Sequence, residues 1–197
     1  MKLLIPLLIS ITCFGQDTIK TQLRKDRATM YGCIAVISAP AIVMFNNADT
    51  KGGKVFHGIS ALGSISCAVL SLSNSRGRTV ARNALFAFAG AMDAFSEELQ
   101  FHYPQVKAKL PFLNDQYFDP SISWKNKYSS SLPFAETLLV STTDGYHSSR
   151  AISKLSFIGG IILIDFNRPF KKQLKQIAIG SLLYVTTKGI IHQTFKN

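Results

Sequence analysis

Acidic and histidine side chains gather at two places next to apolar stretches of this sequence. In DAFSEELQFHY, Asp93 and Glu97 are four residues apart and share one face of a helix. Glu98 and His102 share the adjacent face at the same spacing. An ionised side chain in apolar surroundings is costly unless it has a partner or a function. This group is therefore a candidate for binding, catalysis or pairing between helices.

The second group lies in ETLLVSTTDGYHSSR, residues 136–150. Glu136, Asp144 and His147 stand at offsets of zero, eight and eleven, which puts them on one face if the segment is one continuous helix. Arg150 follows one turn after His147. If the helices of the two groups face each other, their polar side chains converge into one buried cluster.

Two interpretations of that cluster remain open. Carboxylates with an imidazole can hold a divalent metal, whose bound water becomes acidic enough to attack an ester. Alternatively, the same side chains form a structural network of salt bridges and hydrogen bonds, with Arg150 as the cationic partner. The metal interpretation takes as its ligands Asp93, Glu97, Asp144 and His147.

Other hydrolase signatures are incomplete. Ser149 and Arg150 resemble part of a lipid-phosphatase signature, but Ser156 stands where that family has a histidine. The sequence also lacks the Gly-x-Ser-x-Gly elbow of serine hydrolases. His57 and His192 are isolated along the sequence, and we interpret them as hydrogen-bonded structural histidines.

The first fifteen residues have the pattern of an export signal. Lys2 supplies the positive charge, residues 3–11 the apolar stretch, and Gly15 the small residue before the cleavage point. We therefore expect residues 1–15 to be removed and the mature chain to reach the cell envelope.

The elements that must position the polar groups are helices. Residues 28–48 and 55–75 each form a window of 21 residues without Asp, Glu, Lys or Arg, which is long enough to cross a bilayer. The polar turn between them favours a helical hairpin over 28–75. Later apolar windows are shorter, so two to six spans remain open. We predict an all-α, membrane-associated bundle that forms a single domain over 16–197.

Residues 103–133 stand apart from these windows. Four prolines are expected to break any long helix there, and six aromatic residues are interleaved with lysines. Aromatic rings beside lysines are typical of a membrane–water interface. We interpret this segment as an irregular, aromatic-rich loop that covers the bundle, and a lid over a binding site is the alternative.

The chain is basic, with a formal net charge of +11. A nucleic-acid partner would require a basic face or a known binding module, and neither is evident. Basic residues that flank apolar segments instead suit anionic lipid headgroups. We expect membrane lipids, and no nucleic acid, as partners.

The segments DAFSEELQFHYP, FDPSISWKNKY and STTDGYH together resemble a small uncharacterised family of exported bacterial membrane proteins. The resemblance covers residues 84–150 and implies no activity. The function that we expect is an integral membrane protein with a structural or binding role. The alternative is a membrane-embedded, metal-dependent hydrolase acting on a lipid or another amphipathic substrate.

Overall fold

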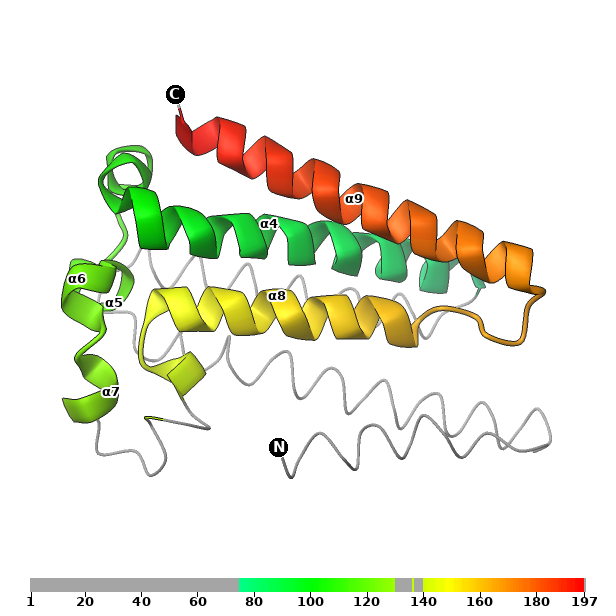
Figure 1. The fold of residues 1–197 in the computed structure, drawn as a ribbon, viewed down its shortest axis with the longest axis horizontal. Helices are drawn as coiled ribbons and strands as arrows, with labels where there is room; N and C mark the ends of the chain where they lie inside the picture. Colours follow the sequence, from blue (N-terminus) through cyan, green and yellow to red (C-terminus); the bar gives the residue numbers. More distant parts are fainter. Residues whose placement is uncertain (1–74, 130–135, 137–139, 197) are drawn as a thin grey trace.

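Helices account for all the regular structure in the described residues, which are 75–129, 136 and 140–196 of a computed structural model. Three long helices form a bundle: α4 (Ser75–Lys109), α8 (Gly145–Ile162) and α9 (Phe170–Lys196) (Figure 1). The shorter elements are α5 (Asp115–Phe118), α6 (Pro120–Ser123), α7 (Asn126–Ser129) and the 3-10 helix η1 (Val140–Thr142). The predicted all-α class and helical bundle are confirmed.

Helix α4 is central to the bundle because both other long helices pack against it. Figure 1 shows α9 running parallel to α4 on one flank, while α8 runs antiparallel on the other. Residues near the start of α9 therefore lie beside residues near the start of α4, and residues near the two ends also lie side by side.

Small residues allow the three helices to approach closely. The Phe86 ring of α4 packs against Gly160 of α8 and Gly180 of α9, where an added Cβ would lie 3.0 Å and 2.5 Å from the ring. Ser153 of α8 donates a 2.8 Å hydrogen bond to the backbone carbonyl of Ala89. The Thr187 hydroxyl of α9 lies 2.8 Å from the backbone carbonyl of Ala87 and 2.8 Å from that of Leu183, so its single proton is shared between α4 and its own helix. Both flanks of α4 thus combine close contact with hydroxyl-to-backbone bonds.

The aromatic segment is more helical than predicted. Helix α4 continues through Pro104 to Lys109, with non-helical backbone angles at His102 (φ −136°, ψ 34°). Proline lacks an N–H and crowds the preceding turn, so two helical stretches meet at a kink just before Pro104. The helix is thus interrupted where the prolines begin, as expected, and short helical stretches follow the kink.

After this kink, α5, α6 and α7 lie at one end of the bundle (Figure 1). Leu113, Tyr117 and Phe118 belong to the main hydrophobic core. By contrast, the Trp124 and Tyr128 rings are exposed, next to the ammonium groups of Lys125 and Lys127. The segment therefore covers the end of the bundle with three buried residues and leaves an aromatic and basic rim outside.

Helix α8 begins later than the sequence spacing suggested. Asp144 is its N-cap, with extended backbone angles, and the Asp144 side chain accepts a 2.8 Å hydrogen bond from the backbone N–H of His147. Glu136 lies in a turn well before this cap and is exposed. The expectation that Glu136, Asp144 and His147 share one helical face is therefore wrong, because no continuous helix joins them.

The signal peptide expected over 1–15 lies outside the described residues. So does the hairpin over 28–75, apart from Ser75, which begins α4. Within the described part of the chain, none of the helices is both long and apolar enough to cross a membrane.

Candidate functional site

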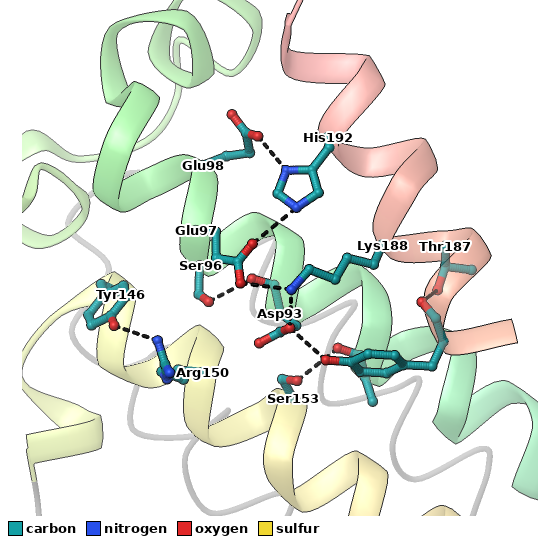
Figure 2. A network of polar contacts seen from close by, with 12 residues as sticks. Asp93, Ser96, Glu97, Glu98, Tyr146, Arg150, Ser153, Thr187, Lys188 and His192 are labelled. Carbon is teal, nitrogen blue, oxygen red and sulfur yellow. Dashed lines mark hydrogen bonds and ion pairs between the residues drawn. The ribbon is translucent and has the colours of Figure 1, made fainter. Parts of the chain in front are cut away.

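The strongest polar cluster joins α4 to α9 (Figure 2). The Lys188 ammonium lies 2.7 Å from Asp93 Oδ2 and 2.7 Å from Glu97 Oε1, so one cation bridges two carboxylates. The Tyr184 hydroxyl donates a 2.6 Å hydrogen bond to the same Asp93 oxygen. These residues succeed one another at four-residue spacing on each helix, which places each set on one face. We call them, with Glu98 and His192, the α4–α9 network.

Glu98 is the most buried acid of this network, with 2% of its side chain exposed. Its Oε1 lies 2.5 Å from His192 Nδ1, and the other ring nitrogen of His192 lies 3.1 Å from Glu97 Oε2. Both ring nitrogens can donate to carboxylates at once only when the ring is doubly protonated. Glu98 Oε2 is 3.0 Å from His102 Nδ1, although this contact lacks hydrogen-bond geometry.

The pKa values of the network follow from its pairing. Burial alone would raise the pKa of Asp93. Hydrogen bonds from Lys188 and Tyr184, with the charges of Lys188 and Arg150, outweigh burial and lower the pKa of this carboxyl. For Lys188, burial alone would lower the pKa. The hydrogen bonds and charges of its two carboxylate partners outweigh burial and raise this pKa. Burial and the bond to Asp93 raise the pKa of Tyr184 to about 12, so its hydroxyl stays a donor.

The second group lies at the start of α8. Asp144 Oδ2 is 2.7 Å from His147 Nδ1, and 3% of the Asp144 side chain is exposed, compared with 35% of His147. Arg150 donates a 2.7 Å hydrogen bond to the Tyr146 hydroxyl and is exposed. A buried carboxylate therefore holds the imidazole of His147 in a fixed orientation.

The four residues of the metal interpretation thus fall into two groups. Among the described residues, no hydrogen bond or ion pair joins Asp93 or Glu97 to Asp144 or His147. Nor does this part of the chain contain three or more His, Cys, Asp or Glu side chains grouped to hold a metal ion. The described contacts therefore give the metal interpretation no support.

The main cation of the network was not predicted. We expected Arg150, which acts on Asp93 only through its charge, whereas Lys188 makes the direct contacts. His192, interpreted from the sequence as isolated, contacts two carboxylates. The available signal was the i, i+4, i+8 row of Tyr184, Lys188 and His192, which places three polar side chains on one face of an otherwise apolar stretch.

Together, the fold and this network define an all-α bundle whose helices are joined by paired charges. Comparisons of the chain with protein-family models, curated proteins and solved structures found no match.

Proposed function

We propose that the chain is an exported, membrane-associated helical bundle that serves as a structural or binding component of the cell envelope. The observation that carries the structural role is the pairing within the α4–α9 network. Asp93 and Glu97 share Lys188, while Glu98 contacts His192. Carboxylates already bonded to Lys188 or His192 join the two helices and are not free to hold a metal or activate water.

The bundle packs through small residues that allow close backbone contact and through hydroxyl groups that hydrogen-bond across the helix interfaces. Gly160 and Gly180 provide such contacts around Phe86, and Ser153 and Thr187 donate to the backbone of α4. The sequence adds the export signal and the two apolar windows, which we propose as the anchor.

The test is fractionation of cells that express the full chain. We expect the protein in the membrane fraction, lacking residues 1–15, and resistant to extraction by carbonate or high salt. Recovery of the mature chain in a soluble fraction without detergent would contradict membrane association. Amino-terminal sequencing of the purified protein checks cleavage after Gly15 in the same material.

A metal-dependent hydrolase is the second candidate, and the pair of Asp144 and His147 is the observation that favours it. In metal and acid–base sites, a carboxylate commonly orients a histidine through one ring nitrogen and leaves the other for chemistry. Metal analysis of detergent-purified protein separates the two proposals. We expect substoichiometric zinc, manganese and iron. Stoichiometric metal that is lost in His147→Ala would favour the hydrolase.

A further inference from the structure

The corner between α8 and α9 exposes aromatic rings. Phe166 lies in the connection between the two helices and is 57% exposed, and Phe170 begins α9 at 70% exposed. Leu174 and Ile177 continue this exposed apolar stripe along the first two turns of α9. Exposed apolar side chains that lie together mark surfaces that contact another molecule or a membrane.

Four cations neighbour these rings in the sequence. Arg168, Lys171, Lys172 and Lys175 are all exposed, and Asp165 is the single acid between residues 165 and 175. Asp165 pairs with Arg168 at 2.8 Å. None of the three lysines forms an ion pair with another described residue. The surface of the corner therefore has a net charge of +3, four cations less one acid.

A buried arginine behind the corner adds to this positive charge. Arg82 is 5% exposed and donates to the side-chain oxygens of Gln176 (2.6 Å) and Asn83 (3.3 Å). Its Nε atom has no hydrogen-bond partner, and neither of its two partners is charged. Burial and the nearby charge of Arg168 lower its pKa. The corner is thus a place where an anion would be stabilised.

The apolar stripe continues beyond the corner. Residues 176–187 contain no Asp, Glu, Lys or Arg, a length of about 18 Å along the helix axis. Within it, Leu182 and Val185 are 67% and 64% exposed. An exposed apolar stretch next to a cluster of cations suits contact with anionic lipid headgroups.

We propose that the α8–α9 corner, comprising residues 165–177, docks on the surface of an anionic phospholipid membrane. Phe166 and Phe170 enter the boundary between headgroups and acyl chains, and the four cations contact lipid phosphates. The proposal rests on the membrane association proposed above. Charge complementarity selects this occupant, because a second copy of the chain would bring the same unpaired lysines together.

The test places a fluorescent reporter at the corner of the full chain. Because Trp124 is the only tryptophan, Trp124→Phe with Phe170→Trp gives an unambiguous signal. Trp124→Phe with Phe101→Trp is the matched control, since Phe101 is 68% exposed on α4. Both proteins are diluted from detergent and mixed with preformed vesicles of phosphatidylcholine, with or without phosphatidylglycerol, whose acyl chains are brominated. Flotation of the vesicles is measured on the same samples.

We expect bromine to quench the Phe170→Trp reporter several-fold more than the Phe101→Trp reporter, and to do so only in anionic vesicles. In the Phe170→Trp protein, replacing Lys171, Lys172 and Lys175 by Gln should weaken the interaction about fivefold per charge. Equal quenching of the two reporters, or equal quenching of the Phe170→Trp reporter in neutral vesicles, would overturn the docking proposal. If the chain floats but the Phe170→Trp reporter is unquenched, docking fails and membrane association stands. If the chain floats with neither vesicle, both fail.

Discussion

The two flanks of α4 are held by different chemistry. Towards α9, Lys188 and His192 pair with three carboxylates of α4, whereas towards α8 the Ser153 hydroxyl bonds to a backbone carbonyl. In the observed register, each of these three carboxylates has a basic partner on α9. Contacts through small residues and hydroxyl groups instead depend on the two helices lying close together, and they do not change with pH. Both interfaces should therefore respond to volume, whereas only the α4–α9 interface should also respond to charge and pH.

The largest expected effect comes from forcing α4 and α9 apart. A Cβ on Gly90 would overlap the backbone carbonyl of Tyr184, which cannot move aside as a side-chain tip can. We expect Gly90→Ala to lower the free energy of unfolding by about 2–3 kcal/mol. The matched control is Gly189→Ala, because an added Cβ there meets no atom within 4 Å. It should stabilise the helix by about 0.5–1 kcal/mol. Thermal unfolding in detergent measures both, and equal stability of the two variants would contradict the close contact.

The next largest loss of stability is expected when the central cation of the network is removed. Lys188→Met leaves Asp93 and Glu97 without their shared partner. Because these side chains are 19% and 34% exposed, the loss should be about 1–2 kcal/mol, less than for a fully buried pair. Lys175→Met is the control, since Lys175 is exposed and outside the network. Denaturant unfolding in detergent compares the two variants, and a neutral Lys188→Met would remove the basis of the network.

The network should also make stability depend on pH at both extremes. The pKa of Asp93 is below its ordinary value of 3.8, so its contribution is complete above that value and is lost as pH falls through the lowered pKa. The pKa of Lys188 is above its ordinary 10.5, so its contribution is complete below that value and is lost as pH rises through the raised pKa. Melting temperatures across pH should show both losses in the wild type. In Lys188→Met, the alkaline loss should shrink, and an unchanged profile would contradict this assignment.

The smallest effect is expected on the α8 flank. Ser153→Ala leaves the Ala89 carbonyl without this donor and should cost about 1 kcal/mol at every pH. Ser156→Ala is the control, because the Ser156 hydroxyl is equally buried but has no hydrogen-bond partner. That variant should be neutral or slightly stabilising. Chemical unfolding at two pH values tests both variants. If the stability lost in Ser153→Ala depended on pH, it would contradict the expected difference between the two flanks.

Local spacing predicted part of the site. Asp93 and Glu97 do share a face, and Glu98 and His102 do share the adjacent one, because four-residue spacing fixes these relations once the segment is helical. Their partners could not be predicted in the same way. Lys188 lies 95 residues from Asp93, and the register between two helices depends on packing around Gly90 and Gly180.

The second group was mispredicted for a local reason. We extended one helical face from Glu136 to His147, although an Asp followed by Gly is a common helix start. The Asp144 side chain bonds to the backbone of its own helix, so the helix begins after it. At Pro104 the expected interruption is present, because two helical stretches meet at the kink at His102, and Tyr103 and Val106 of the second stretch pack in the core.

The most direct test of the charge-paired interface is a double-mutant cycle on Asp93 and Lys188 in the full chain. Asp93→Asn, Lys188→Met and the double variant are unfolded in detergent at neutral pH. If the 2.7 Å pair stabilises the α4–α9 interface, the double variant should lose at least about 1 kcal/mol less than the sum of the single losses. Additive losses would show that the two charges act independently, and would contradict the pairing of α4 with α9 through this network.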